Sequence, residues 1–147
     1  MSLYFHACIQ GNPATMASVK AKVLETIIDD FHSPALAGLN YVAKTNKLVI
    51  YYHSDGKQDI DYEIVFENPR GFKMLDEGDM CNYWEDAKMI NNWLFEIESG
   101  GWLDTEDAAG GFSSKALGFR EFLVASSDDC VSVISNCEPE IIKLPKI

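Results

Sequence analysis

Carboxylates are the side chains of this sequence whose types and spacing point most clearly to chemistry. In residues 60–67 acids largely alternate with apolar residues, and after a turn the chain continues into the acidic phrase Asp76-Glu77-Gly78-Asp79. Grouped carboxylates can exchange protons when they are buried together, coordinate hard cations such as Ca²⁺ and Mg²⁺, or attract a cationic partner. Acid–base catalysis would require burial, which the sequence alone does not reveal.

The sequence lacks the motifs that carry metal or nucleophile chemistry. Neither the acidic phrase nor residues 104–107 (DTED) has the ligand spacing and distal Glu of an EF-hand loop. His6, His32 and His53 are far apart and fit no zinc-binding pattern, and there is no GxSxG, P-loop or GxGxxG motif. Cys81 lies among acids, which favour a protonated, inert thiol. We therefore expect a non-enzymatic protein with no catalytic residue, no cofactor and no metal.

The net charge is a second guide to function. The chain has 12 basic and 23 acidic side chains, giving −11, and residues 61–107 hold 13 of the acids but only three bases. Such a field repels nucleic-acid phosphates and anionic lipids and speeds encounter with a cationic partner. We expect a basic protein partner and no binding to nucleic acid or membrane. The alternative is that the acidic surface serves only solubility.

The candidate partner-binding residues are the outward acids of the strand expected over 60–67, the acids of the acidic phrase, and one tryptophan. Trp102 lies in a glycine-flanked segment, and tryptophan is enriched among the residues that anchor protein interfaces. Packing against the core is the alternative for this side chain. The full set is Asp61, Glu63, Glu67, Asp76, Glu77, Asp79 and Trp102.

The clearest element expected from periodicity is an amphipathic helix that runs from Asn12 to Phe31. Asn12-Pro13 is a favourable start, with Asn as the cap and Pro at the first helical position. Apolar residues then recur at three- and four-residue spacings and form one stripe, and Ser33-Pro34 ends the helix. The stripe comprises Met16, Val19, Val23, Leu24, Ile27, Ile28 and Phe31.

Most of the remaining chain has the two-residue alternation of β-strands joined by short turns. A short helix capped by Asp79 and a long loop over 99–112 with one helical turn interrupt it. These elements predict an α+β fold in one domain, 1–147, with one N-terminal amphipathic helix packed on a mainly antiparallel sheet of six to eight strands. The expected strands are 1–10, 39–44, 47–53, 60–67, 93–98, 117–125, 130–135 and 140–144.

The cysteines and the hydropathy indicate a cellular compartment. Cys8, Cys81, Cys130 and Cys137 show no CxxC spacing, and the sequence has neither a signal-peptide pattern nor an apolar run long enough to span a bilayer. We expect a cytoplasmic protein with reduced thiols. A Cys130–Cys137 bridge across a hairpin is the alternative.

Three stretches carry a resemblance: GFKMLDEGDMCNYW (71–84), FLVASSDDCVSVIS (122–135) and CEPEI (137–141). With these, the chain resembles a loose group of small bacterial accessory proteins of the kind carried in integron gene cassettes and toxin-immunity loci. The resemblance implies a compact, non-enzymatic α+β protein that binds a partner, and it carries over no functional residue.

Three functional hypotheses follow. The first is an interaction module of immunity or antitoxin type whose acidic middle third meets a basic partner. The second is a small-ligand-binding protein or enzyme with a pocket between helix and sheet, for which a deep pocket lined by aromatic side chains and perturbed carboxylates would be evidence. The third is a homodimeric accessory protein, which would present an apolar two-fold interface.

Overall fold

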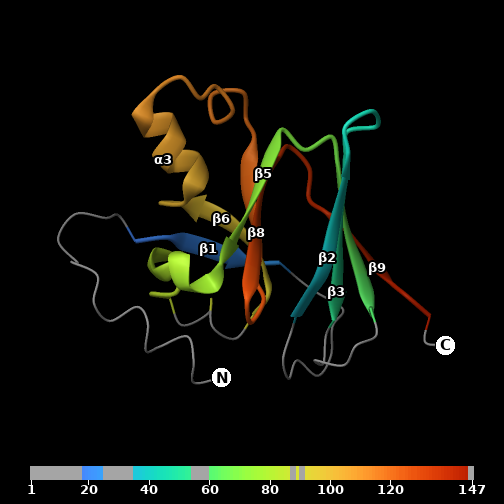
Figure 1. Ribbon diagram of the computed structural model, residues 1–147. Coiled ribbons are helices and arrows are strands. Elements are labelled where there is room, and N and C mark those ends of the chain that lie inside the picture. Colours follow the sequence, from blue (N-terminus) through green and yellow to red (C-terminus); the bar gives the residue numbers. More distant parts are fainter. Residues whose placement is uncertain (1–17, 25–34, 54–59, 87–88, 90–91, 146–147) are drawn as a thin grey trace.

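The computed structural model describes residues 18–24, 35–53, 60–86, 89 and 92–145. Within these residues, nine strands form two antiparallel sheets, and one α-helix lies beside the larger sheet (Figure 1). No helix in the described part of the chain is long and apolar enough to cross a membrane.

The larger sheet has five strands in the order β1-β6-β7-β8-β5, and every neighbouring pair is antiparallel. Two of its three inner strands, β7 and β8, are buried along almost their whole length, on both faces. This explains why residues 121–125 and 130–135 read as nearly continuous apolar and small residues rather than as an alternating pattern. The strands are β1 (Lys20–Val23), β5 (Gly71–Asp76), β6 (Leu94–Ser99), β7 (Arg120–Val124) and β8 (Asp129–Ser135).

The smaller sheet has four strands in the order β2-β3-β4-β9, also antiparallel throughout. In β3 burial alternates strictly, with Leu48, Ile50 and Tyr52 fully enclosed, so one face of this sheet is internal. A turn at residues 43–46 joins β2 to β3, and Asn46 there has φ 46°, a left-handed conformation that Asn tolerates. The strands are β2 (Ala35–Val42), β3 (Lys47–His53), β4 (Tyr62–Glu67) and β9 (Glu140–Lys143).

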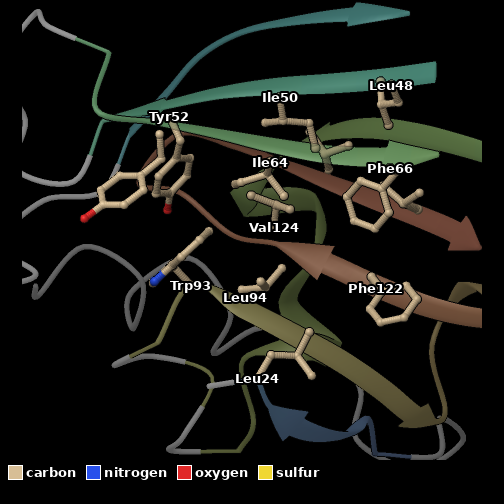
Figure 2. Close-up of a cluster of buried hydrophobic side chains, with 13 residues drawn as sticks. Leu24, Leu48, Ile50, Tyr52, Ile64, Phe66, Trp93, Leu94, Phe122 and Val124 are labelled. Carbon is tan, nitrogen blue, oxygen red and sulfur yellow. The ribbon is translucent and has the colours of Figure 1, made fainter. Parts of the chain in front are cut away.

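The two sheets face each other and enclose the main hydrophobic core (Figure 2). Phe66 of β4 meets Phe122 of β7 with ring centroids 5.8 Å apart. At one end Tyr52 stacks on Trp93, with ring centroids 4.9 Å apart, and donates its hydroxyl hydrogen to the carbonyl of Ala125. The buried set is Leu24, Leu48, Ile50, Tyr52, Tyr62, Ile64, Phe66, Trp93, Leu94, Phe122, Val124, Val131 and Val133.

The other face of the five-stranded sheet is covered as well. Two 3₁₀ turns, η2 (Glu77–Asp79) and η3 (Cys81–Tyr83), and the helix α3 (Trp102–Ala109) lie on the side away from the smaller sheet (Figure 1). A second cluster of buried side chains fills this layer, so the five-stranded sheet is the middle layer of three. The cluster comprises Val19, Ala21, Met80, Tyr83, Trp84, Met89, Phe95, Ile97, Leu123, Ala125 and Cys130.

The prediction of an N-terminal helix is wrong in the part that can be compared. Lys20–Val23, in the middle of the expected helix 12–31, form β1 and pair with β6. Ala21 is buried between exposed Lys20 and Lys22, a period of two that the helical reading overlooked.

The strand count of nine exceeds the expected six to eight, and the strands form two sheets instead of one. The rest of that helix, the strand within 1–10 and the turn after His53 lie outside the described residues.

The long loop expected over 99–112 contains a longer helix than predicted. Trp102–Ala109 form α3, a helix of eight residues rather than a single turn. The strands expected over 47–53, 60–67, 93–98, 130–135 and 140–144 are confirmed with small shifts of their ends. In the short helix expected after Asp79, Cys81–Tyr83 form the 3₁₀ turn η3, and Asp79 is the last residue of the separate turn η2.

The cysteines differ from the expectation of four reduced thiols. Cys130 and Cys137 are free, so the alternative of a bridge between them is wrong. Cys81 is disulfide-bonded. Burial raises the pKa of the Cys130 thiol to about 12, which keeps it protonated and inert at neutral pH.

Candidate functional site

A dense grouping of like charge lies where β5 ends and β8 begins. Asp76, the last residue of β5, is the direct cross-strand partner of Asp129, the first residue of β8. Glu77 and Asp79 follow in η2, and the Glu77 backbone N–H donates to the carbonyl of Asp128 at 2.8 Å. We name Asp76, Glu77, Asp79, Asp128 and Asp129 the acidic end cluster.

Hydrogen bonds fix the backbone that carries this cluster. The Asp76 carboxylate accepts from the Gly78 N–H at 2.8 Å and thereby caps η2. The indole Nε1–H of Trp84, a buried side chain, donates to the Glu77 carbonyl at 2.9 Å, and the Met80 N–H donates to the same carbonyl at 3.2 Å. The cluster is therefore a preorganised arrangement anchored in the core.

The charges of the cluster repel one another. Burial raises the pKa of Glu77, and the nearby charges of Asp76 and Asp128 raise it further. Like charges directly opposite each other across two strands, as at Asp76 and Asp129, are also destabilising. None of the ion pairs formed among the described residues includes a member of the cluster. A cation brought here would relieve this repulsion.

The acids of β4 lie on the other sheet. Glu63 and Glu67 alternate with inward-facing residues and lie on the outward face of the four-stranded sheet, as the sequence predicts. Glu67 forms an ion pair with Lys47 at 3.3 Å. Asp61 lies just before β4, where its N–H donates to the Tyr52 carbonyl at 3.0 Å. The structure thus brings together the acids of the acidic phrase and separates them from Asp61, Glu63 and Glu67, because β4 and β5 belong to different sheets.

Trp102 is the first residue of α3 and is partly buried. The Lys73 ammonium lies 5.0 Å from the centre of its ring, and the ring of Phe112 packs against it with centroids 6.3 Å apart. These contacts favour packing within the fold, the alternative to a role of Trp102 as an anchor for a partner.

Glu121 of β7 is a buried carboxylate that the sequence did not single out, with only 1% of its surface exposed. Its Oε1 accepts from the Tyr83 hydroxyl at 2.6 Å and the Trp102 N–H at 3.1 Å, and its Oε2 accepts from the Leu103 N–H at 3.1 Å. The N-cap of α3 is Gly101, which has no side chain to cap the helix. Glu121, on the neighbouring strand β7, accepts hydrogen bonds from the first N–H groups of α3 instead.

The electrostatics of Glu121 agree with this structural role. Burial raises its pKa, while the hydrogen bonds from Tyr83, Leu103 and Trp102 and the charge of Lys73 act in the opposite direction. Burial likewise raises the pKa of Tyr83. Because both carboxylate oxygens hold the start of α3, Glu121 serves as an internal cap rather than as a reacting group.

A small cavity of about 160 Å³ lies beside α3, over β6 and β7. Four of its charged side chains form two ion pairs: Lys115 contacts Asp104 at 2.9 Å and Arg120 contacts Glu96 at 3.0 Å. The Gly100 N–H and Lys115 lower the pKa of Asp104, which keeps it ionised in this pair. The volume lies below the roughly 300–1,000 Å³ of ordinary small-molecule sites. Among the described residues, no group of three or more His, Cys, Asp or Glu is arranged to hold a metal ion.

Two members of the cluster were missed at the sequence level. Asp128 and Asp129 were not among the candidate residues, although they raise the number of carboxylates here from three to five and Asp129 pairs with Asp76 of β5. The missing information was the pairing of β8 with β5, which connects residues about fifty positions apart in the chain. Comparison of this chain with family models, with curated proteins and with solved structures gives no match.

Proposed function

We propose that this protein is a non-enzymatic interaction module, of the immunity or antitoxin type, that binds a basic protein through its acidic end cluster. The observation that supports the proposal is the arrangement of five carboxylate residues at one end of the middle sheet, where no ion pair among the described residues neutralises them. The bacterial accessory-gene context belongs to the same proposal and rests on the sequence resemblance.

Two physical properties suit the cluster to docking. Lysine or arginine side chains that approach the cluster relieve the mutual repulsion of its acids. This relief contributes favourably to the free energy of binding. The backbone under the acids is held by hydrogen bonds to Asp128 and Trp84, which reduces the ordering cost of association.

The experiment measures association of a labelled oligolysine peptide with the full chain by stopped-flow fluorescence. The double variant Glu77→Gln/Asp79→Asn should bind more slowly than wild type, and the rates of the two proteins should converge as salt rises. The cause is screening, since the Debye length falls from about 30 Å at 0.01 M to about 10 Å at 0.1 M.

The matched control is Glu138→Gln/Glu140→Gln, which removes the same charge on and near β9. Equal slowing by both double variants would show that only net charge matters, and the acidic end cluster would then not be the docking site.

The compartment is tested by counting thiols. The scattered cysteines favour the cytoplasm, whereas the disulfide at Cys81 favours an oxidising compartment, because disulfides are rare in the cytosol. Titration of denatured, unreduced protein with a thiol reagent decides between them. Four reactive thiols support the cytoplasm, and only two, from Cys130 and Cys137, support the oxidising compartment.

A further inference from the structure

A second surface feature lies at the end of β5 opposite the acidic end cluster. Here the turn between β2 and β3, the turn between β4 and β5, and the segment before β7 enclose a shallow groove of about 500 Å³. This volume falls within the roughly 300–1,000 Å³ of small-molecule sites. Arg70 is the one charged residue in a lining that comprises Tyr41, Ala43, Asn46, Asn68, Pro69, Arg70 and Phe119.

The Arg70 side chain is exposed but held in place. Its guanidinium lies 5.0 Å from the centre of the Phe119 ring, and its Nη2 donates to the Ser113 hydroxyl at 3.1 Å. Its backbone N–H donates to the Ile134 carbonyl at 2.8 Å, which fixes the turn to β8. Stacking and a single neutral hydrogen bond orient the guanidinium and leave it further N–H donors.

Arg120 provides a comparison within the same molecule. Its guanidinium also stacks on a phenylalanine, 5.1 Å from the centre of the Phe122 ring, but it contacts Glu96 at 3.0 Å and Glu138 at 3.8 Å. None of the ion pairs among the described residues includes Arg70. In a chain with 23 acids and 12 bases, Arg70 is thus an oriented cation whose charge no described carboxylate neutralises.

The other walls of the groove combine aromatic rings with amides. The Tyr41 hydroxyl donates to Asn46 Oδ1 at 3.0 Å, and the Tyr41 ring packs on Phe72 with centroids 5.2 Å apart. The Asn68 N–H donates to the Asn46 carbonyl at 2.8 Å and joins the two turns. Ring faces suit a planar apolar group, and amides can hydrogen-bond a polar substituent.

We propose that this groove binds a small organic carboxylate that carries an aromatic ring, with Arg70 receiving the carboxylate. A guanidinium matches a carboxylate in a bidentate geometry, and the rings of Tyr41 and Phe119 contact the aromatic part. The site is independent of the acidic end cluster, so it can be tested without the basic partner.

The test titrates the isotope-labelled full chain with phenylacetate at low salt and follows the amide resonances by NMR. Phenylacetate should produce saturable shifts at Asn46, Asn68 and Arg70, with a dissociation constant on the order of millimolar for a ligand of this size. Its neutral analogue phenylacetamide should bind at least tenfold more weakly. Acetate and inorganic phosphate, which lack the ring, should also bind at least tenfold more weakly.

Variants assign the effect to the arginine. Arg70→Gln should abolish the saturable shifts, and Arg70→Lys should weaken binding severalfold, because lysine keeps the charge but loses the planar fork and the stack. Arg120→Gln removes the same charge from an already paired arginine and should leave binding unchanged. The amide spectra of all variants report whether they are folded. If Arg70→Gln does not fold, the proposal is tested by comparing the binding of phenylacetate and phenylacetamide to the wild-type protein.

Three outcomes would overturn the proposal. One is no saturable shift at concentrations roughly tenfold above the expected constant. Another is equal binding by wild type and folded Arg70→Gln. The third is acetate, phosphate or phenylacetamide binding as tightly as phenylacetate, since the groove would then not recognise an aromatic carboxylate.

Discussion

At the scale of single residues, Glu121 joins three separate parts of the chain. It lies on β7, accepts a hydrogen bond from Tyr83 in η3, and caps the start of α3 through Trp102 and Leu103. This arrangement removes a carboxylate from water, which costs free energy, and burial accordingly raises the pKa of Glu121. Stability and pH are therefore coupled at this residue.

The sign of that coupling gives a prediction for Glu121→Gln. Because the folded-state pKa lies above the ordinary value of 4.5, the stability contributed by Glu121 is fully present below that value and is lost as pH rises through the folded-state pKa. The unfolding free energy of wild type relative to Glu121→Gln should fall over this interval, by about 1.4 kcal/mol for each pKa unit of elevation.

Urea titrations of both proteins at a series of pH values measure this difference. Glu98→Gln, which removes the same charge at an exposed position of β6, is the control variant. A flat difference between wild type and Glu121→Gln would contradict the raised pKa.

At the scale of elements, the position of α3 depends on how closely its N-terminus approaches β7. A Cβ added to Gly101 would collide with the Glu121 carboxylate and lie 2.8 Å from Ile97 Cγ2. Gly101→Ala should therefore displace the internal cap and lower the unfolding free energy by about 1–3 kcal/mol, the usual cost of overpacking.

Gly38→Ala is the matched control, because a Cβ there meets Tyr51 Cδ2 at 3.8 Å, an ordinary contact. Chemical denaturation of both variants makes the comparison. A loss below about half a kcal/mol in Gly101→Ala would mean that α3 moves away from β7 without cost.

The elements that the sequence predicted well are those with one buried face. In β3 and β4 the alternation of Leu48, Ile50, Ile64 and Phe66 reports directly which side faces the core. In β1 the signal failed, because Val19 and Val23 are four residues apart and fit a helical stripe as well as a strand. Pairing with β6 decided between the two, and that contact is not local.

The site was predictable only in part for a similar reason. The acidic phrase was visible as a local run of carboxylates, but its extension by Asp128 and Asp129 depends on the pairing of β5 with β8. The sequence also did not reveal that β4, which carries Glu63, and β5, which leads into the acidic phrase, belong to different sheets. Arg70 was counted as a base within the acidic third, and only the structure shows that it has no carboxylate partner among the described residues.

At the scale of the whole molecule, β5 separates two surfaces of opposite character. Arg70 directly precedes β5 and Asp76 ends it, so about 20 Å of strand lie between the groove and the acidic end cluster, at roughly 3.3 Å per residue. Figure 1 shows the turn before β5 and the 3₁₀ turns after it at opposite ends of the middle sheet. A basic partner at one end and a carboxylate ligand at the other would thus not compete for the same surface.

The uneven charge also predicts how salt acts on the free protein. With a net charge of −11, the folded chain repels itself, and raising salt from 0.01 M to 0.1 M shortens the Debye length from about 30 Å to about 10 Å. The unfolding free energy of wild type should therefore rise over this range. Because the charges of Asp76 and Asp128 act on Glu77, Glu77→Gln/Asp79→Asn should be more stable than wild type at 0.01 M, by about 0.2–1 kcal/mol, the range measured for exposed charge pairs.

That gain should shrink at 0.1 M, where salt already screens the repulsion. Glu138→Gln/Glu140→Gln is again the control, because Glu138 lies 3.8 Å from the Arg120 guanidinium and its removal relieves no crowding. Urea titrations at both salt concentrations measure the three proteins. An equal gain in the two double variants at low salt would trace the effect to net charge and contradict a local concentration of repulsion at the end of β5.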